Sequence, residues 1–489
     1  MRKLFLAIFA VALVLVAVVL GRAVLLASSR QPTVPATAAV DHALAASAAG
    51  HLAEAVRFQT ISLNDTTRPD AALDAMRAWM ETTYPKLHAA LTRELIADKS
   101  IVFTWKGSNP ALPPLVLMAH MDVVPVEPGT ESKWTHGAFS GDIAEGFVWG
   151  RGTLDDKLNV IGELEAIEAL IGANFVPKRT VILSFGHNEE VLGSGAKAIA
   201  TAFAQRNIHP LMVVDEGGAV AAGVFPGLNR PVALIGISEK GYVSVELTAD
   251  AQGGHSSAPP NWTATGIVAA AVTKLEQNPM PARLDGTTRT FFETLAPEMP
   301  FGARAMLGNL WLFRPLAKMF LARDPASNAM IRTTTAPTMF EGSVKDNVLP
   351  ARARAVINFR ILPGDSTASV IAHVTEVIDD PRVRVVALNG GGSNPSAVSD
   401  VNGAPYQLLV RTIQEAMPDA FVAPYILIGA TDSRHFGVVT HDIFRFSPMR
   451  IGPTDLARAH GTNERAGVDN LAEVVTFYMK LVRNADGAP

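Results

Sequence analysis

Short apolar runs alternate with amphipathic segments between residues 48 and 237. The apolar runs PLVLMAHMDVVP, TVILSFGHNEE and LMVVDEGG each end in polar residues, and the segments between them have helical spacing. Apolar strands that alternate with helices predict βαβ units around a mainly parallel sheet. Ligands of such sheets bind beyond the carboxyl ends of the strands. The polar residues at those ends are therefore the first candidates for chemistry.

The pattern changes at about residue 238, where strands with alternating polarity begin. The order strands, helix, strands, helix, strand over residues 238–395 predicts a small α+β domain inserted into the first one. The chain then returns to the first domain, so residues 48–237 and 396–489 are expected to form one α/β unit. Aromatic residues in the helical section 301–324 are typical of a core, or of a surface that faces a substrate or a membrane.

A long apolar run near the N-terminus follows two basic residues, Arg2 and Lys3. The run Leu4 to Leu20 exceeds the roughly 7–15 residues of a signal peptide's apolar region and approaches the roughly 17–25 that span a bilayer. Residues 1–28 are therefore predicted to be a signal anchor, with a signal peptide as the alternative. An Ala/Pro/Ser-rich linker, 29–47, follows. The bulk of the chain is expected to be exported, anchored to the membrane, or secreted or periplasmic if cleavage occurs.

Composition narrows the chemistry that the chain can perform. With 489 residues, two or more domains are expected. A net charge of -4 and the lack of long basic runs argue against nucleic acid as a partner. Because the chain contains no cysteine, any metal site must use His, Asp and Glu.

Histidines and carboxylates gather at the predicted strand ends. The segment AHMDVVP supplies His120 and Asp122, and the turn GRGTLDDK supplies Asp155 and Asp156. The other candidates of this kind are Glu189, Glu190, Asp215, Glu216 and His460. Zinc binds imidazole and carboxylate oxygen together, and two ions roughly 3.5–4 Å apart need a bridging carboxylate. We therefore expect two zinc ions per subunit, although other divalent ions suit the same ligands.

Eight motifs occur in an order that resembles a known family. They are HMDVVP, GRGTLDDK, NEEVLGSGA, DEGG, GGHSS, NFRILPG, GATDSRHF and HGTNE. The chain resembles, over roughly residues 48–485, the aminoacylase, carboxypeptidase S and succinyl-diaminopimelate desuccinylase family of co-catalytic zinc metallopeptidases. Its segments NLWLFRPL and IRTTTAPTMFEGSVKDNVLP are most similar to carboxypeptidase S and the N-fatty-acyl-amino-acid synthase/hydrolases. The resemblance implies an α/β zinc-peptidase catalytic domain and an inserted α+β, ferredoxin-like domain that serves as lid and dimerisation domain.

The resemblance also implies roles for five of the candidate residues. His120 resembles the ligand of one zinc ion, and Asp122 the carboxylate that orients its imidazole. Asp155 resembles the bridging ligand, and Glu190 and His460 the pair that binds the second ion.

Two further assignments depend on the neighbouring acids. Glu189 is implied to be the general base, which takes a proton from water and returns it to the leaving amine. In VVDEGG the aligned ligand is either Asp215 or Glu216, and both stay open. The peptide bond Asp155-Asp156 is implied to be cis.

Substrate contacts are implied to come from the lid and from one catalytic loop. His255 in GGHSS resembles a histidine that stabilises the oxyanion of the neighbouring subunit's site. Asn347 and Arg360 resemble lid residues that hold the substrate, and an Arg fork suits a free carboxylate. Gly429 and Thr431 belong to the loop near the substrate.

We therefore expect a zinc-dependent amidohydrolase that acts next to a free carboxylate. Its substrates would be N-acyl amino acids or short peptides cleaved at the C-terminal residue, and fatty-acyl groups would allow the reverse condensation. The alternatives are a pure peptidase and an inactive, membrane-anchored binding relative. An inactive relative should have lost ligands or the base, and this chain retains them all. A homodimer formed through the lid is expected from the resemblance alone.

Overall fold

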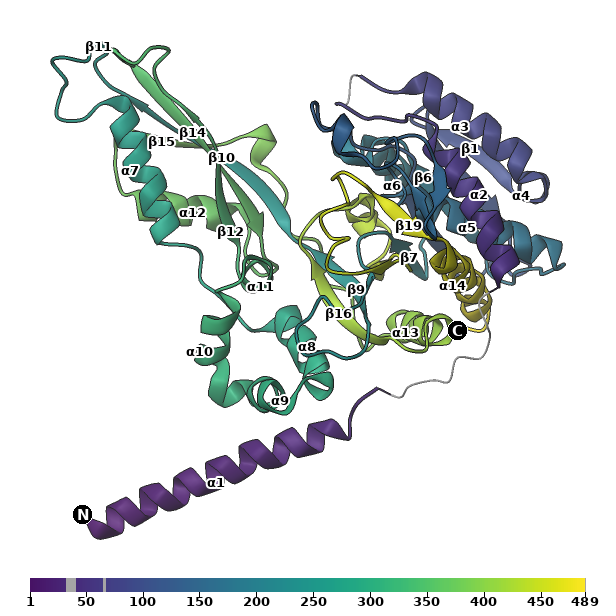
Figure 1. Ribbon diagram of the computed structural model, residues 1–489, viewed down its shortest axis with the longest axis horizontal. Coiled ribbons are helices and arrows are strands. Elements are labelled where there is room, and N and C mark those ends of the chain that lie inside the picture. Colours follow the sequence, from purple (N-terminus) through teal and green to yellow (C-terminus); the bar gives the residue numbers. More distant parts are fainter. Residues whose placement is uncertain (32–40, 65–66, 489) are drawn as a thin grey trace.

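Two separate β-sheets organise the computed structural model, which describes residues 1–31, 41–64 and 67–488 (Figure 1). The predicted linker 29–47 includes residues 32–40, which lie outside the described residues. Its last part is helical, because α2 begins at His42.

The larger sheet is mixed, with parallel strands at its centre. Its order is β1 (Thr92–Ile96), β2 (Ser100–Trp105), β6 (Val181–Gly186), β3 (Leu115–His120), β7 (Met212–Asp215), β17 (Ile443–Arg445), β9 (Val232–Glu239), β8 (Val220–Ala221) and β18 (Arg450–Ile451), with β16 (Phe421–Leu427) also paired to β9. The prediction of a mainly parallel central sheet is confirmed for β6, β3, β7 and β17. Strands β1 and β2 extend the sheet in antiparallel fashion, which the βαβ pattern did not predict.

Helices cover both faces of this sheet, which explains its unbroken apolar strands. Every residue of β3 and of β6 is buried. Alternate residues of a strand point to opposite faces, so Leu117 and Val116 pack in different clusters. One face carries α2 (His42–Val56), α5 (Lys157–Gly172) and α14 (Val468–Asp486), and the other carries α6 (Ser194–Gln205).

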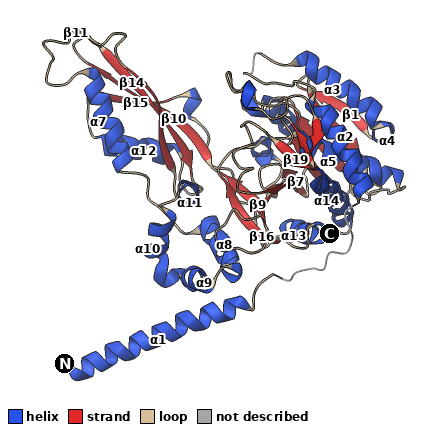
Figure 2. Ribbon diagram, in the orientation of Figure 1, coloured by secondary structure: helices blue, strands red, loops and turns tan. Residues whose placement is uncertain are grey.

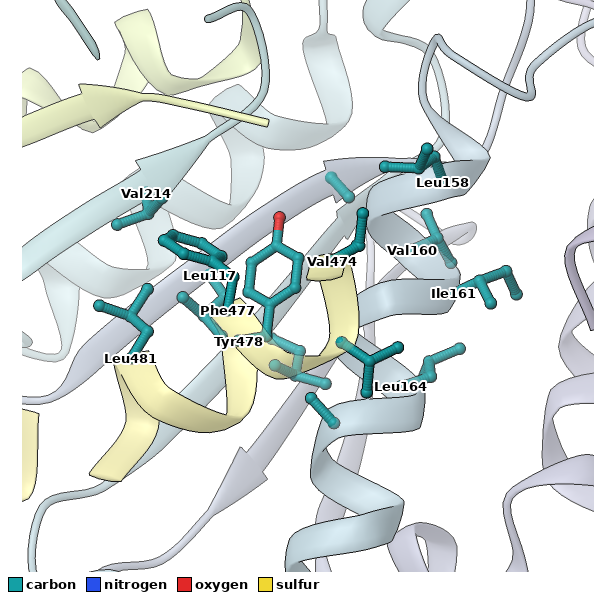
Figure 3. Packing of buried hydrophobic residues seen from close by; sticks show 14 of the residues in the cluster. Leu117, Leu158, Val160, Ile161, Leu164, Val214, Val474, Phe477, Tyr478 and Leu481 are labelled. Carbon is teal, nitrogen blue, oxygen red and sulfur yellow. The ribbon is translucent and has the colours of Figure 1, made fainter. Parts of the chain in front are cut away.

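Helix α14 belongs to the second segment of the large α/β unit and packs on strands of the first segment. Figure 3 shows its Phe477 and Leu481 beside Leu117 of β3 and Val214 of β7, and all four belong to one buried cluster. Fully burying a large apolar side chain contributes about 1.5–3 kcal/mol. The last residues of the chain therefore help to hold the strands that carry the site.

The second sheet is antiparallel, with the order β12 (Thr334–Glu341), β14 (Arg352–Ile361), β10 (Gly241–Asp250) and β15 (Val383–Ala387). Together with α7 (Ala264–Gln277) and α12 (Thr367–Ile378) it forms a unit that we call the lid (Figure 2). The succession β10, α7, β12, β14, α12, β15 is that of a ferredoxin-like fold. Alternate residues of β10, such as Val245 and Leu247, are buried with the helices.

Four short helices between α7 and β12 form a unit that we call the helical insert. They are α8 (Gly286–Leu295), α9 (Phe301–Leu307), α10 (Leu310–Leu321) and α11 (Pro325–Ile331). The predicted helical section 301–324 is thus broken into α9 and α10 at Gly308 and Asn309. A Cβ atom at Gly308 would lie 2.2 Å from Leu26 Cδ1. The N-terminal helix therefore makes a close contact with the chain at the break between α9 and α10.

The remaining elements are small or peripheral. They are α1 (Arg2–Ala27), α3 (Asp70–Thr83), α4 (Pro85–Ala90), α13 (Ala404–Ala416), the three-stranded sheet of β4 (Asp142–Ala144), β5 (Phe147–Trp149) and β19 (Arg465–Gly467), and the pair β11 (Gly254–His255) and β13 (Val348–Leu349). Among the described residues, α1 is the one helix that is long and apolar enough to cross a membrane.

Candidate metal centre

Several of the predicted site residues lie at the ends of adjacent strands of the large sheet, or just beyond them. His120 is the last residue of β3, and Asp215 is the last residue of β7. Glu189 and Glu190 open a single 3₁₀ turn shortly after β6. Because β6, β3 and β7 are parallel neighbours, their carboxyl ends meet at one edge of the sheet. The strand ends therefore bring together residues that are far apart in the sequence.

Asp155 lies between two imidazole rings. Its Oδ1 is 2.9 Å from His120 Nε2, and its Oδ2 is 2.9 Å from His460 Nε2. His460 Nε2 is also 3.3 Å from Glu190 Oε2, and the other carboxylate oxygen of Glu190 is buried without a partner. Ligand atoms of His120, Asp155 and Glu190 all lie within 4.8 Å of one another. One carboxylate that faces a different imidazole with each oxygen has the arrangement that a bridging ligand requires.

Asp122 fixes both a ring and a turn. Its main-chain oxygen is 3.1 Å from His120 Nδ1, and its Oδ1 is 3.4 Å from the same nitrogen. The Asp122 carboxylate also accepts the backbone N–H groups of Glu189 (3.1 Å) and Glu190 (3.3 Å). A proton on Nδ1 leaves Nε2 of His120 to face Asp155. One buried carboxylate thus positions the imidazole and both adjacent glutamates.

Asp215 and Glu216, which the sequence left as alternatives, have different surroundings. The Asp215 carboxylate accepts the N–H groups of Glu216 (2.9 Å) and Ser433 (2.7 Å). Within the described part of the chain, no group donates a hydrogen bond to the Glu216 carboxylate. Burial, together with the charges of Asp155 and Asp156, raises the pKa of Glu216 well above its usual range. Asp215 is therefore already bound by two backbone N–H groups, whereas Glu216 is not, and the choice between them as the metal ligand stays a prediction.

The carboxylates of the centre outnumber the groups that could neutralise them. Burial raises the pKa of Glu189 well above its usual range, and it also raises the pKa of Glu190. Hydrogen bonds to Asp155 and Glu190 raise the pKa of His460 to about 10. A divalent cation would supply the missing positive charge, and imidazole with carboxylate oxygen is a donor set that zinc accepts. The residues present therefore fit the predicted metal.

A buried ion pair between Arg151 and Glu464, which the sequence analysis did not identify, supports the turn that carries Asp155. The Glu464 carboxylate accepts the N–H groups of Gly152, Leu154 and Asp155 at 2.8–3.2 Å. Arg151 donates to it at 2.6 Å. Glu464 is part of the HGTNE motif, but an acid in a polar segment does not differ by sequence from a surface residue.

The same pair positions His460. Arg151 Nη2 donates to the main-chain oxygens of His460 (3.1 Å) and Gly461 (3.0 Å). The backbone of His460 has φ +59°, a left-handed conformation that residues other than glycine adopt at an energetic cost. Arg151 and Glu464 therefore hold a strained ligand loop against the turn that carries Asp155.

The predicted lid residues are not gathered at this centre. His255 lies exposed in β11, which Figure 1 shows at the tip of the lid, away from the large sheet. Asn347 is exposed nearby, and its main-chain oxygen accepts the N–H of Ser256 at 3.2 Å. The Arg360 guanidinium lies 5.1 Å from the Tyr242 ring centre, on the lid sheet.

The loop after β16 does border the centre. Gly429 lies half-buried in this loop, and Thr431 is buried. The Thr431 hydroxyl donates to Glu239 at 2.8 Å, while the N–H of Ser433 binds Asp215. Thr431 is thus placed beside the site, but its hydroxyl is directed to a buried carboxylate. The peptide bond Asp155-Asp156 is cis, as the resemblance implied.

Comparison with known proteins identifies the family. The model of peptidase family M20/M25/M40 matches residues 116–484. The chain belongs to this peptidase family. It is 40% identical over 444 residues to the probable carboxypeptidase S-like 2 of Dictyostelium discoideum, a match that covers 90% of this chain and 85% of that protein. It is also 40% identical over 436 residues to the N-fatty-acyl-amino acid synthase/hydrolase of Homo sapiens, covering 88% of this chain and 86% of that protein.

A solved structure shows the same fold. The M20 family metallo-carboxypeptidase of Sulfolobus solfataricus superposes with a TM-score of 0.63 at 20% identity, over 90% of this chain and 99% of that one. The resemblance inferred from the motifs is confirmed, and the chain is a metal-dependent hydrolase of this family. The alternative of an inactive binding relative gains no support from these relatives.

We predict that Glu464→Gln weakens metal binding without touching a ligand. The amide would face the Arg151 guanidinium, and breaking a buried ion pair costs about 3–5 kcal/mol. Loss of the support should lower metal affinity by about 10–100-fold. Chelator competition and chemical unfolding would measure the two effects. Glu131→Gln, at an exposed position, is the control. Unchanged metal affinity in Glu464→Gln would show that the ligands hold their positions without the pair.

Proposed function

We propose that the enzyme is a two-zinc amidohydrolase that cleaves an amide bond next to a free carboxylate. The observation that carries the proposal is the Asp155 carboxylate, which faces His120 with one oxygen and His460 with the other. We assign His120, Asp155 and Glu216 to one ion, and Asp155, Glu190 and His460 to the other. When bound, zinc polarises a carbonyl group and lowers the pKa of water.

Glu189 is proposed as the general base. Its backbone N–H is held by Asp122, and its buried carboxyl group lies next to the ligands without pairing to His120 or His460. The carboxylate would accept a proton from the attacking water while the new C–O bond forms. It would then give that proton to the amide nitrogen as the C–N bond breaks. The two adjacent glutamates would thus have separate roles, Glu190 at the metal and Glu189 at the moving proton.

The lid is proposed to complete the site of a second subunit. His255 and Asn347 lie exposed at the tip of the lid, so a neighbouring subunit could receive them. Strand β12 is an edge of the lid sheet, and its side chains Met339 and Phe340 are exposed. An uncovered edge strand is suited to pairing with another chain. These features support a homodimer in which His255 stabilises the oxyanion of its partner's reaction and Arg360 binds the substrate carboxylate.

Fatty-acyl amino acids are the proposed substrates. The support is the human relative's name, together with its 40% identity over most of this chain. Short peptides are the second candidate, supported by the carboxypeptidase S-like relative. Both substrate classes present an amide beside a free carboxylate, and the catalytic groups proposed above serve either one.

The N-terminal helix is proposed to anchor the enzyme to a membrane. Only 6% of its most apolar stretch is buried. The end of α1 is nevertheless attached to the folded domain, since Asn309 donates to the Val19 oxygen at 3.3 Å and Gln31 donates to the Val422 oxygen of β16 at 2.7 Å. A helix that contributes to tertiary contacts fits an uncleaved anchor better than a removed signal peptide.

We predict that Glu189→Gln retains both metal ions and loses turnover. Removing a general base typically lowers the rate about 10²–10⁴-fold. Metal analysis and kcat would be measured on the same preparation. The matched variant Glu190→Gln should instead lose metal, because it removes a ligand. Nearly normal turnover in Glu189→Gln would eliminate Glu189 as the base.

N-oleoyl-phenylalanine should be hydrolysed with a higher kcat/KM than the dipeptide Gly-Leu. N-acetyl-phenylalanine serves as the matched control, because it keeps the amino acid and lacks the long chain. The reason is that burying the acyl chain contributes about 0.8 kcal/mol per CH₂ group. Faster turnover of the dipeptide would reject the fatty-acyl assignment and leave the peptidase assignment standing.

Mixed dimers test the exchange of His255. His255→Ala and Glu189→Gln should each be nearly inactive alone, the former by about 10²–10³-fold because an oxyanion donor is lost. A purified heterodimer of the two should regain about half of the normal turnover, since one of its two composite sites is intact. If the heterodimer stays inactive, His255 does not act across the subunits.

A further inference from the structure

Helix α10 has an apolar face that the protein leaves uncovered. The exposed side chains are Trp311 (54%), Leu312 (40%), Leu316 (40%), Met319 (50%) and Phe320 (47%). The spacing of Leu312, Leu316, Met319 and Phe320 places them on one side of the helix. The opposite side is already packed, because Leu310 and Ala317 are buried in the core of the helical insert. The exposed face is therefore an additional apolar surface that does not take part in the core of the helical insert.

This face begins where the N-terminal helix meets the folded domain. Asn309, directly before α10, donates to the Val19 oxygen, and Arg22 Nε donates to the Gly308 oxygen, each at 3.3 Å. Ala23 is fully buried in this contact. In Figure 1, α9 lies between α1 and α10. The start of α10 is thus held beside α1 by the contacts of Gly308 and Asn309.

The length of α1 sets the level of this contact in a bilayer. Residues 4–21, between Lys3 and Arg22, extend about 27 Å at 1.5 Å per residue. The hydrocarbon core is about 30 Å thick. With Lys3 at one surface, Val19 and Arg22 lie at the other. The start of α10 then lies at the boundary between headgroups and acyl chains.

The positive charges on and beside α10 also fit a position at the boundary between headgroups and acyl chains. Arg314 and Arg323 are exposed, and the Arg323 guanidinium lies 5.0 Å from the centre of the Phe320 ring. Lys318 is turned inward, where it donates to the Ala282 oxygen at 3.1 Å. The nearby acid Asp324 caps α11 through the N–H of Ser327. Exposed arginines beside Trp and Phe are typical of helices that lie in the interface of an anionic membrane.

We propose that α10 is a second membrane contact, which lies in the interface of an anionic lipid bilayer beside the α1 anchor. Trp311, Leu312, Leu316, Met319 and Phe320 insert among the acyl chains, and Arg314 and Arg323 face the headgroups. The proposal rests on the proposed anchoring role of α1. Two separate contacts prevent the catalytic domain from rotating freely about the anchor. Amphiphilic substrates that dissolve in the same leaflet would meet the enzyme in a fixed orientation.

Single thiol probes can test this contact, because the chain has no cysteine of its own. Met319→Cys, Val11→Cys and Val176→Cys would each be labelled with the fluorophore NBD in the full chain. The proteins would be reconstituted in vesicles of phosphatidylcholine and phosphatidylglycerol. Met319 tests α10, Val11 tests α1, and Val176 is a control that is 70% exposed and lies just before β6.

The probe at position 319 should be quenched by doxyl lipids labelled near the headgroup and protected from iodide. The probe at 176 should respond to iodide alone. If 319 behaves like 176 while 11 is quenched by doxyl lipids, the α10 proposal is wrong and the anchor stands. If neither 11 nor 319 is quenched by lipid, the anchor proposal itself fails.

Other occupants of the face give different results. Protection of the 319 probe only after N-oleoyl-phenylalanine is added would mean that the face binds substrate tails, and would overturn the proposal. Protection that depends on protein concentration in lipid-free detergent would mean that a second copy covers it, and would also overturn it. The double variant Leu316→Glu/Met319→Glu should bring a probe at Trp311→Cys back into water, with unchanged turnover of N-acetyl-phenylalanine. Retained lipid quenching in that variant would contradict the insertion of this face.

Discussion

The carboxylate of Asp155 is the point on which the site depends, because it holds two histidines from distant parts of the chain. His120 ends β3, and His460 belongs to a loop that follows the lid and β16 in the sequence. Attraction between a carboxylate and imidazoles would not by itself fix such a loop. The buried Arg151–Glu464 pair supplies the missing constraint, since it binds the Asp155 turn and the His460 backbone at the same time. The fold therefore has to close before the metal centre exists.

The sequence predicts those parts of the fold whose secondary structure follows from a local pattern of apolar and polar residues. Strands β3, β6 and β7 are unbroken apolar runs because both faces of the sheet are covered. Strand β3 ends in His120, β7 ends in Asp215, and Glu189 follows shortly after β6. Helix α12, Thr367–Ile378, is the second helix in the strand and helix order that was predicted for residues 238–395. The features that were missed depend on tertiary contacts. Gly308, beside the break between α9 and α10, has no room for a side chain because Leu26 lies against it, and the importance of Glu464 comes from backbone groups more than 300 residues away.

A second buried network connects the metal centre with the root of the lid. Glu239 ends β9 and accepts hydrogen bonds from Thr431 and Arg445. Ser433, in the same loop as Thr431, binds Asp215. The lid sheet begins two residues after Glu239, at Gly241, where a Cβ atom would lie 2.5 Å from the Ser393 oxygen. The loop that contains Thr431 and Ser433 is thus tied to the large sheet, and the lid sheet begins at a close backbone contact.

Strand β16 connects the surroundings of the N-terminal helix with the loop beside the metal centre. Its Phe421 and Ala423 pack in the core of the helical insert, and its Val422 exchanges hydrogen bonds with the side chain of Gln31, just after α1. The same strand ends at Leu427 and continues directly into the loop that contains Gly429 and Thr431. A strand of seven residues therefore lies between the contacts of Gln31 and the loop that contains Gly429 and Thr431. Under the proposed anchoring by α1, this strand would set the position of the active site relative to the bilayer, and an amphiphile could react while its tail stays in the leaflet.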